Sequence, residues 1–563
     1  MFVIPDVIHS DASERVGNPV FFVAAFGNLM HLGGHSRLDK RKIIRSAGMV
    51  GFFILLSRVF GLVREMAMAA FFGSSLAMDA FVVAFRIPNL FRSLFGEGAL
   101  SSAFVPVFTE TLEKQGREKV WSFAANMFSF LSLILAALVA AGILLASLAL
   151  AFLHPSPRLA LILDLLRIML PYMFFICLTA FFSAILNSLR RFTLPAVTPV
   201  AMNIIMIAVL FLVCPFLPAT GDWRIKAVAW SVIAAGIIQV VMQLPQLARH
   251  GFRVHISMDW RDQRVRRVWQ LMGTTIIGVG VTQVNIQLNS IAAILIGPGS
   301  PSYLYYAERL IYLPLGLFAT ALGTILLPAF SGHVTQGRTD LVRDTLNHAL
   351  RQLMFIMLPV AVGMFVLAGP IVRLVYERGA FSALSTDMTT LAVQCYAPGL
   401  IVFSLLKVLI PVFYAQQDMK TPMQIGIACT ALNVALMLIL MWPLQHAGIA
   451  LATVISSGVQ VVIMGFLVHR RIGSPGWRNI FGAVGRMAAA AAAMALVTFW
   501  VYQSIQPVSW LSARHGLLRQ LVPLGLSVAA AILTYGAAAA ACRCSELGEF
   551  WTALRRKNVE REA

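Results

Sequence analysis

The chain has 563 residues, of which 59% are apolar and 12% are charged, and its mean hydropathy is +0.80. A soluble domain carries about 25% charged residues, so the composition excludes a soluble globular protein. Apolar runs long enough to cross a bilayer recur from end to end, which predicts an all-α polytopic membrane protein. The net charge of +20 does not indicate nucleic acid binding, because most Lys and Arg residues lie in short loops that set membrane topology.

The hydropathy pattern predicts about fourteen transmembrane helices. Several runs exceed the ~20 residues needed to cross a bilayer, and we expect these helices to be tilted, kinked or extended beyond the lipid. The predicted spans are 46–72, 77–107, 121–153, 159–188, 194–217, 225–248, 268–297, 303–331, 343–370, 386–415, 421–443, 447–469, 480–504 and 516–541.

Basic residues gather in alternate loops between these spans. The richer set lies at 40–45, 114–119, 190–191, 249–267, 338–343, 420 and 470–478, with 555–557 in the tail. The opposite loops hold mainly Arg158, Arg224, Lys226, Arg378 and Arg514. Because cytoplasmic loops carry the excess of Lys and Arg, this asymmetry places both termini in the cytoplasm.

The N-terminal extension, residues 1–42, has a different character. Its apolar run 20–32 is too short to span a bilayer. Acidic residues precede that run, whereas a signal peptide begins with basic ones. We interpret 1–42 as an extension outside the membrane domain, and a segment lying on the membrane surface is the alternative.

Two blocks of sequence indicate an internal repeat. Pro171 and Pro195 bracket one predicted helix and its following loop, and Pro398 and Pro422 bracket another with the same spacing. Both blocks cross the membrane in the same direction, as in transporters that bind substrate between two parallel repeats. Prolines that merely end helices are the alternative. The predicted parts are an N-lobe of six helices (43–250), a C-lobe of six helices (251–475), two further helices (476–543) and a cytoplasmic tail (544–563).

The first predicted span carries Arg58, Arg64 and Glu65. Arg58 lies about twelve residues into the span, or roughly 18 Å along the helix, which is near mid-membrane. A charge at the bilayer centre costs roughly 3 kcal/mol or more, so such residues are rarely without a function. A structural Arg–Glu pair is the alternative, but it neutralises only one arginine. We favour a hydrated cavity whose arginines suit an anionic, phosphate-bearing ligand.

The second predicted span carries Asp79, Arg86, Arg92 and Glu97. On an ideal helix Asp79, Arg86 and Glu97 share one stripe while Arg92 faces away. Pro88 removes a helix hydrogen bond and usually produces a kink, so the ideal geometry fails beyond it. Helical periodicity therefore leaves open whether Arg86 or Arg92 faces a cavity.

Two further spans carry polar clusters. In the eighth, Glu308 and Arg309 lie among tyrosines, where an interfacial aromatic belt with a snorkelling arginine is as good an interpretation as a binding site. In the seventh, Thr, Gln, Asn and Ser residues crowd 274–290. These favour the lining of a hydrated cavity, and interhelical hydrogen bonds that pack the bundle are the alternative.

Sequence signatures of enzymes and metal sites are missing. The chain has no H-E-x-x-H, G-x-S-x-G or Walker motif, and its six cysteines show no metal-ligand spacing. We therefore predict a transporter and not an enzyme, with no metal and no cofactor. A transferase acting on lipid diphosphates would need clustered acids, and a membrane scaffold would not need intramembrane arginines.

Five motifs give the chain a specific resemblance. They are SRVFGLVRE from Ser57, MDAFVVAFRIPNLFRSLFGEGALSSAFVPVF from Met78, YYAERLIYLPLG from Tyr305, LGTILLPAFS from Leu322 and YAQQDMKTP from Tyr414. Over roughly 43–505 the chain resembles the MurJ (MviN) family of lipid II flippases, within the superfamily of multidrug/oligosaccharidyl-lipid/polysaccharide exporters. The resemblance implies two six-helix lobes around a V-shaped central cavity, and a lipid-tail groove formed by the last two helices.

The resemblance also implies functional residues. The family's essential arginines match Arg58, Arg64, Arg92 and Arg309, which implies substrate binding there, and its essential acid matches Asp79. We expect Asp79, together with Glu65 and Glu97, to control conformation, with Asp79 pairing with an arginine in one state only. Glu65 stands where relatives often have Asp, and Arg86 where some have Lys. The acids of a sodium site found in some relatives have no match, so we assign no coupling ion.

The implied cargo is lipid II, the undecaprenyl-diphosphate-linked peptidoglycan precursor. Alternating access would carry it from the inner to the outer leaflet of the bacterial cytoplasmic (inner) membrane. Expected partners are lipid II, membrane lipid and the cell-wall synthesis machinery, and the expected state is a monomer. The alternative is an exporter of the same fold for another polyprenyl-linked oligosaccharide, or for drugs by ion antiport. A site for cationic drugs would need net negative charge, which the arginines oppose.

Overall fold

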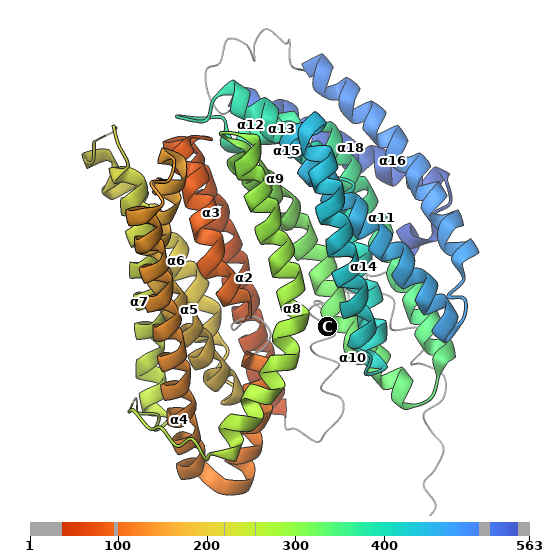
Figure 1. The fold of residues 1–563 in the computed structure, drawn as a ribbon. Helices are drawn as coiled ribbons and strands as arrows, with labels where there is room; N and C mark the ends of the chain where they lie inside the picture. The colour runs from red at the N-terminus through yellow and green to blue at the C-terminus, as the bar shows by residue number, and fades with distance from the viewer. Residues whose placement is uncertain (1–36, 95–99, 219, 254, 506–517, 550–563) are drawn as a thin grey trace, which may run out of the picture. The chain divides into compact units, whose positions relative to one another are not determined.

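Helices make up most of the described part of the chain (Figure 1). The computed structural model describes residues 37–94, 100–218, 220–253, 255–505 and 518–549, and within these ranges it contains no β-strand. The predicted all-α class is therefore confirmed. Residues 1–36 of the predicted extension, Glu97 and most of the predicted tail lie outside the described residues.

The helices form two compact units. The N-terminal unit comprises Ser36–Tyr305 together with the short segment Tyr376–Ser385, and the C-terminal unit comprises Tyr306–Val375 and the chain from Thr386 onward. By its contacts, the first helix after residue 250 thus groups with the N-terminal unit. The predicted lobe boundary at 250/251 concerns the sequence repeat and stays a prediction.

The helices up to residue 296 are α2 (Arg37–Phe72), α3 (Leu76–Phe91), α4 (Leu100–Phe152), α5 (Pro157–Ser188), α6 (Thr193–Leu212), the short η2 (Cys214–Phe216), α7 (Trp223–Arg249) and α8 (Gln263–Ile296). Those that follow are α9 (Ser300–Pro314), η3 (Leu315–Ala319), α10 (Thr320–Thr335), α11 (Thr339–Val366), α12 (Ala368–Tyr376), α13 (Ala383–Tyr396), α14 (Gly399–Ala415), α15 (Lys420–Ile472), α16 (Trp477–Ile505) and α18 (Leu518–Ala541).

Two of these helices are each a pair of helices joined by a sharp break. Both α4 and α15 have 53 residues, and each contains one residue with positive φ, Gly116 at 81° and Gln445 at 50°. An unbroken helix of that length would measure roughly 80 Å, far more than a hydrocarbon core of ~30 Å. Among the described residues, nine helices are long and apolar enough to cross a membrane, and the bent pair α13–α14 passes the same test together. The total of fourteen spans stays a prediction.

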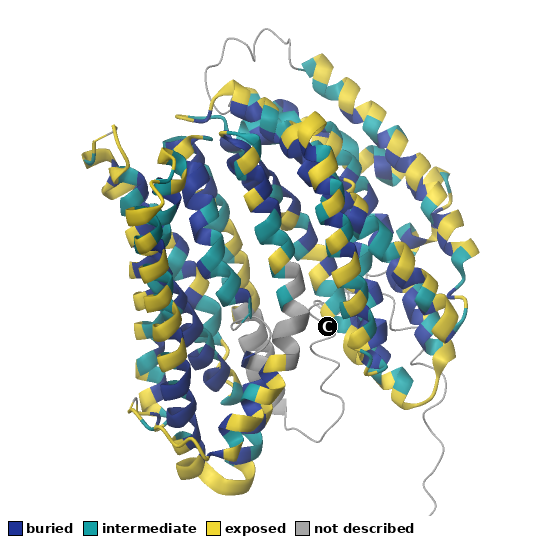
Figure 2. Ribbon diagram, in the orientation of Figure 1, coloured by how far each residue is buried: buried dark blue, intermediate teal, exposed yellow. Residues whose placement is uncertain are grey.

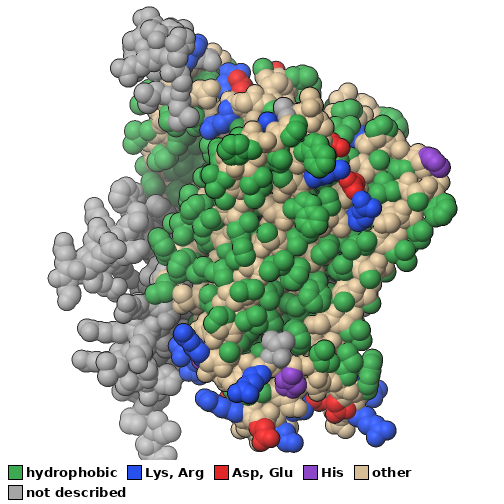
Figure 3. All heavy atoms as spheres, turned by 90° about the vertical axis from the view of Figure 1, so that its left-hand side faces the viewer, with side chains coloured by type: hydrophobic (Ala, Val, Ile, Leu, Met, Phe, Trp, Pro, Cys, Tyr) green, Lys and Arg blue, Asp and Glu red, His purple; other side chains and the backbone are tan. Residues whose placement is uncertain are grey.

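The outward faces of the helices are apolar. Buried and exposed strips alternate along the helices in Figure 2, and Leu144, Leu145 and Leu148 are among the exposed residues of α4. On the face shown in Figure 3, hydrophobic side chains cover the middle, and charged side chains gather toward the upper and lower ends. This distribution suits a protein whose solvent is lipid over most of its surface.

Each unit has its own packed core. In the N-terminal unit the ring centroid of Phe104 lies 5.0 Å from that of Phe181 and 5.4 Å from that of Phe123. In the C-terminal unit α11, α16 and α18 share a buried cluster, in which the hydroxyl of Tyr535 donates to the carbonyl of Phe355 at 2.9 Å. Alanines of α16 in this cluster allow the helices to approach closely.

The short segment Tyr376–Ser385 packs against the C-terminal end of α2. The amide of Ala380 donates to the carbonyl of Ala70 at 2.8 Å. Gly73 and Gly379 lie at this contact with φ of 56° and 58°, and a Cβ on Gly379 would lie 2.3 Å from the Ala70 oxygen. Both the positive φ and the close approach require glycine here.

Candidate functional site

Arg64 and Glu65 of α2 form an ion pair that reaches two other helices. Arg64 Nη2 contacts Glu65 Oε1, and the two side chains are only 12% and 4% exposed. Arg64 Nη1 donates to Asn203 Oδ1 of α6 at 3.0 Å, and the hydroxyl of Tyr305 in α9 donates to Glu65 Oε1 at 2.9 Å. A structural Arg–Glu pair was the alternative considered for this span. The structure contains such a pair between Glu65 and its sequence neighbour Arg64, and the pair positions the guanidinium of Arg64.

Arg92 shares a neighbourhood with Arg64. It follows the last residue of α3, where its Nε donates to Asn89 Oδ1 at 2.7 Å. The charges of Arg92 and Arg64 both act on the buried hydroxyl of Tyr172 in α5. Two of the four predicted arginines, from different elements, thus lie close to one point in the N-terminal unit. Arg58, which is exposed, lies six residues before Arg64 on α2, or roughly 9 Å along the helix.

Arg86 contacts α8. Its Nη1 donates to the carbonyl of Ile286 at 3.1 Å, and Gln287 donates in return to the carbonyl of Arg86 at 3.0 Å. These two bonds tie α3 to α8, and they favour a packing role for Arg86. Gln287 belongs to the polar cluster of the predicted seventh span, and its bond is of the interhelical kind that was the alternative for that cluster.

Asp79 lies fully buried in the first turn of α3 and accepts four hydrogen bonds. Its Oδ1 accepts from the amide of Ser302 at 3.1 Å and from the Ser302 hydroxyl at 2.6 Å. Its Oδ2 accepts from the amide of Gly299 at 2.7 Å and from Nη2 of Arg158 at 3.1 Å. The carboxylate therefore caps the N-terminus of α9, where the first amides have no partner within the helix.

Arg158, at the start of α5, completes this network from the other side. Its Nη1 donates to the carbonyl of Ile294 at 2.8 Å and its Nη2 to the carbonyl of Gly297 at 3.0 Å, both at the C-terminal end of α8. A cation at a helix C-terminus and an anion at a helix N-terminus each interact favourably with the helix dipole. One ion pair, Asp79–Arg158, thus joins α3 and α5 to the turn between α8 and α9.

The remaining predicted residues fall elsewhere. Glu308 and Arg309 belong to the C-terminal unit, where Arg309 is exposed and the hydroxyl of Tyr396 donates to Glu308 Oε1 at 3.4 Å. Glu97 lies outside the described residues. Within the described ranges no group of three or more His, Cys, Asp or Glu side chains could hold a metal ion.

An apolar pocket of about 500 Å³ lies beside α16 in the C-terminal unit. Leu405 of α14, Phe466 of α15, and Trp477 and Phe481 of α16 are among its lining residues. The predicted lipid-tail groove involves the last two helices, of which α16 lines this pocket and α18 does not.

Arg158, Asn203 and Ser302 are among the residues of these networks that were not predicted as site residues from the sequence. Arg158 served only to assign topology, and neither Asn203 nor Ser302 was singled out. A signal existed for Ser302, because Ser and Pro at the start of 300–302 are typical of a helix N-terminus, which favours an anion. Asn203 is a single amide in the apolar helix α6, and nothing in its neighbourhood in the sequence marks its partner.

Comparison with known proteins gives the chain its family. The model of the family described as "Lipid II flippase MurJ" matches residues 68–515. The chain is 33% identical over 509 residues to the "Probable lipid II flippase MurJ" of Vibrio cholerae serotype O1, an alignment that covers 88% of this chain and 96% of that protein. This chain belongs to the MurJ family. The resemblance predicted from the five motifs is confirmed, as is the prediction of a transporter instead of an enzyme.

Solved structures agree with membership of the MurJ family. A structure of "Lipid II flippase MurJ, inward closed conformation" is similar with a TM-score of 0.72 and 26% identity, covering 87% of this chain and 97% of that one. An inward-facing multidrug resistance MATE family transporter of the MOP superfamily matches with a TM-score of 0.64 and 13% identity, covering 80% and 98% of the two chains. At that identity the second likeness shows a shared fold alone.

Proposed function

We propose that this chain is a flippase for lipid II, the undecaprenyl-diphosphate-linked peptidoglycan precursor. Alternating access moves the precursor from the inner to the outer leaflet of the bacterial cytoplasmic membrane. Membership of the MurJ family supports this cargo. The observation on this chain that carries the proposal is Arg64, which Glu65 and Asn203 hold inside an otherwise apolar helix bundle, since an arginine at membrane depth suits a phosphate group.

The chemistry of the cargo explains why arginine is needed. A diphosphate-linked sugar cannot cross hydrocarbon unaided, because removing its charges from water costs many kcal/mol. Arginine replaces the lost hydration with planar, bidentate hydrogen bonds. The residues that we propose for diphosphate binding are Arg58, Arg64, Arg92 and Arg309. Glu65 and Asn203 hold Arg64 in place on the protein side, which orders its guanidinium before the cargo arrives.

The lipid tail needs apolar surroundings only. The apolar pocket beside α16 offers them, and we assign part of the tail to it while the rest stays in the bilayer. Because the lining of the pocket is apolar apart from His469, it distinguishes lipids mainly by shape and length.

We infer that Asp79 controls conformation. The position of Asp79 supports this inference. Its carboxylate binds the first turn of α9 and also binds Arg158, which in turn binds the end of α8. A state in which these bonds are broken lies higher in free energy, unless new contacts or the cargo offset the loss. The arginine that pairs with Asp79 is Arg158 and not one of the proposed cargo-binding arginines. Glu97 keeps its proposed conformational role.

We further propose that both termini are cytoplasmic and that the flippase is a monomer in contact with the cell-wall synthesis machinery. The alternation of basic loops supports the orientation. The deciding experiment for function is complementation of a strain depleted of its own flippase, with lipid II in the outer leaflet measured by its accessibility from the periplasm.

In this experiment wild type should restore accessibility, while Arg58→Ala, Arg64→Ala and Arg92→Ala should lose most of it at equal membrane levels. Arg→Lys should restore little, because an ammonium lacks the planar fork. Arg191→Ala is the matched control, since this exposed arginine lies in a loop. If the three arginine-to-alanine variants complement as well as the control, the proposed arginine site is rejected. If wild type itself fails to complement, the assignment of lipid II as the cargo is rejected.

A further inference from the structure

The described residues of the loop between α7 and α8, 250–253 and 255–262, lie along α4. The backbone N–H of Ser257 donates to Ser129 Oγ at 2.9 Å, and that of Asp259 donates to Asn126 Oδ1 at 2.9 Å. Asn126 Nδ2 returns a hydrogen bond to the carbonyl of Asp259 at 3.0 Å. Side chains of α4 thus satisfy the polar backbone groups in the middle of the loop.

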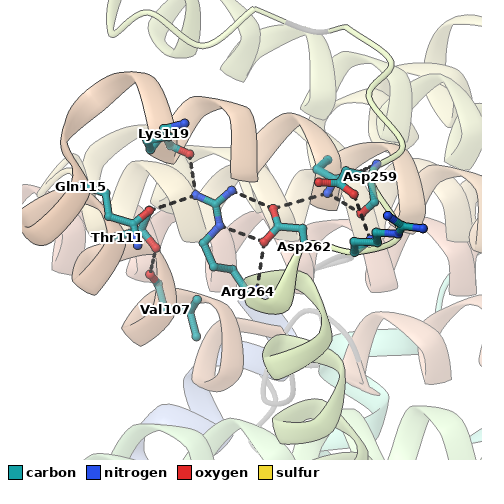
Figure 4. Close-up of polar contacts among 9 residues, drawn as sticks. Val107, Thr111, Gln115, Lys119, Asp259, Asp262 and Arg264 are labelled. Atoms are coloured by element: carbon teal, nitrogen blue, oxygen red, sulfur yellow. Dashed lines mark hydrogen bonds and ion pairs between the residues drawn. The ribbon is translucent and has the colours of Figure 1, made fainter.

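Charged groups fix the end of the loop to the same helix (Figure 4). Asp262 accepts from the amide of Arg264 at 2.9 Å and binds its guanidinium through Nε at 2.9 Å and Nη2 at 2.8 Å. Arg264 also donates to the carbonyl of Lys119 at 3.1 Å, and its guanidinium lies over the ring of Phe123. Burial opposes ionisation of Asp262, but the hydrogen bonds and charge of Arg264 outweigh it and hold the pKa of that carboxyl below its usual range. Asp262 and Arg264 therefore neutralise each other.

The segment around the loop keeps a strong positive charge. Residues 249–267 contain six arginines and two aspartates. Arg264 is neutralised by Asp262, and Arg267 pairs with Glu110 of α4 at 2.9 Å. Arg253 and Arg261, on the loop itself, are exposed. The loop therefore presents cations outward.

Two large apolar side chains lie exposed beside these cations. Ile256 is 83% exposed and Trp260 is 75% exposed. The ring of Trp260 rests edge-on against Phe130 of α4, with centroids 4.5 Å apart, which orients the ring. A tryptophan combined with basic residues is typical of a segment that lies in the boundary between water and lipid.

The place of contact on α4 gives the depth of the loop. Asn126 and Ser129 lie five to eight residues inside the predicted span 121–153, or roughly 8–12 Å along the helix. One turn further, Leu133 and Ile134 are exposed apolar residues of α4. The apolar side chains of the loop thus continue the lipid-facing surface of α4 at the level of the headgroups and the first carbons of the acyl chains.

We propose that this loop is an interfacial anchor for anionic phospholipid, in which Ile256 and Trp260 insert among the acyl chains while Arg253 and Arg261 bind headgroup phosphates. Apolar insertion and cationic attraction act together at such a surface. In the proposed topology this leaflet is the cytoplasmic one. The anchor ties the junction of α7 and α8 to the bilayer, and it does not depend on lipid II.

Insertion is tested by tryptophan quenching. The full chain is reconstituted in vesicles whose phosphatidylglycerol carries bromine near the headgroup end of its acyl chains, and the signal of Trp260 is the difference between wild type and Trp260→Phe. Brominated lipid should quench this difference signal, and aqueous iodide should leave it nearly unchanged. Quenching by iodide and not by lipid would overturn the proposal, and it would indicate a solvated loop or a surface for a soluble protein.

Headgroup binding is tested with spin-labelled phosphatidylglycerol and phosphatidylcholine. Wild type should associate with the anionic lipid several-fold more than with the zwitterionic one, and Arg253→Gln combined with Arg261→Gln should remove most of that preference. The control is Arg117→Gln combined with Lys119→Gln, which removes two exposed charges at the break of α4. An equal loss in both double variants, or a loss in neither, would overturn the proposal. Neither assay measures transport, so a result that overturns the lipid anchor leaves the flippase assignment untouched.

Discussion

Replacing Asp79 by asparagine tests whether its carboxylate holds the first turn of α9. The two oxygens accept from four donors, two on each oxygen. Asparagine keeps one carbonyl oxygen and places an NH₂ group where the other oxygen was. With the NH₂ group in place of Oδ2, both the Gly299 amide and the Arg158 guanidinium face a donor. With the NH₂ group in place of Oδ1, the Ser302 amide faces a donor, although the Ser302 hydroxyl can turn to accept. In either orientation a donor loses its acceptor, and the charge of the ion pair with Arg158 is lost. We therefore expect Asp79→Asn to be nearly as harmful as Asp79→Ala, although it keeps the shape of the side chain.

The size of the effect follows from the contacts that are lost. Loss of a helix N-cap costs about 0.5–2 kcal/mol, and removal of one partner from a buried ion pair costs about 3–5 kcal/mol. The second value is an upper bound here, because Arg158 keeps the carbonyls of Ile294 and Gly297 and its side chain is 15% exposed. We expect a loss of about 3 kcal/mol in the free energy of unfolding. Ser302→Ala removes one hydroxyl contact only and should cost about 1 kcal/mol.

Thermal unfolding of the purified protein in detergent provides the measurement. The melting temperature should fall most for Asp79→Asn and Asp79→Ala, and least for Ser302→Ala. A double-mutant cycle with Arg158→Gln should give a coupling of about 1 kcal/mol or more between Asp79 and Arg158, since residues in one ion pair are not additive. An Asp79→Asn protein that melts together with wild type, or strictly additive losses in the cycle, would refute the reasoning.

Three other outcomes are expected. Gly379→Ala should lower the melting temperature or membrane level because of its close backbone contact, while Gly363→Ala, with nothing within 4 Å of the added carbon, should change neither. Hydrogen bonds from the first turn of α15 lower the pKa of Asp418 to about 2. Its contribution is therefore present above pH ~4 and lost as pH falls toward 2, so the stability gap between wild type and Asp418→Asn should close over that range. A periplasm-active reporter fused after residue 543 should stay silent and one in the loop 506–514 should respond, and the reverse pattern would contradict the topology.

The membrane-crossing helices could be predicted from the sequence because lipid allows few alternatives to a helix. The predicted spans 225–248 and 480–504 agree with α7 and α16 to within three residues. The prediction was poorer where helices leave the lipid. The predicted loop 108–120 belongs to α4, because its Glu, Lys, Gln and Arg residues are strong helix formers although they are polar. Hydropathy measures preference for lipid, so it ends a helix where the lipid ends.

Local spacing predicted the site only in part. Arg58 and Glu65 are seven residues apart, so helical periodicity places them on one face of α2. Glu65 nevertheless pairs with Arg64, because Asn203 and Tyr305 from other helices decide where these side chains lie. Such choices depend on tertiary contacts between residues more than one hundred positions apart. No pattern within one helix contains that information.

Arg158 shows why a charge cannot be assigned from its position in the sequence alone. It stands in a loop just before the predicted span 159–188, where an arginine normally points to water, and yet its guanidinium binds two carbonyls and a buried carboxylate. A buried arginine is tolerated only where the protein or a ligand replaces its hydration. The protein does so for Arg158 and in part for Arg86, whose Nη1 donates to the carbonyl of Ile286 in α8. Arginines that remain exposed in predicted spans, such as Arg58, are therefore the ones whose hydration a diphosphate is best placed to replace.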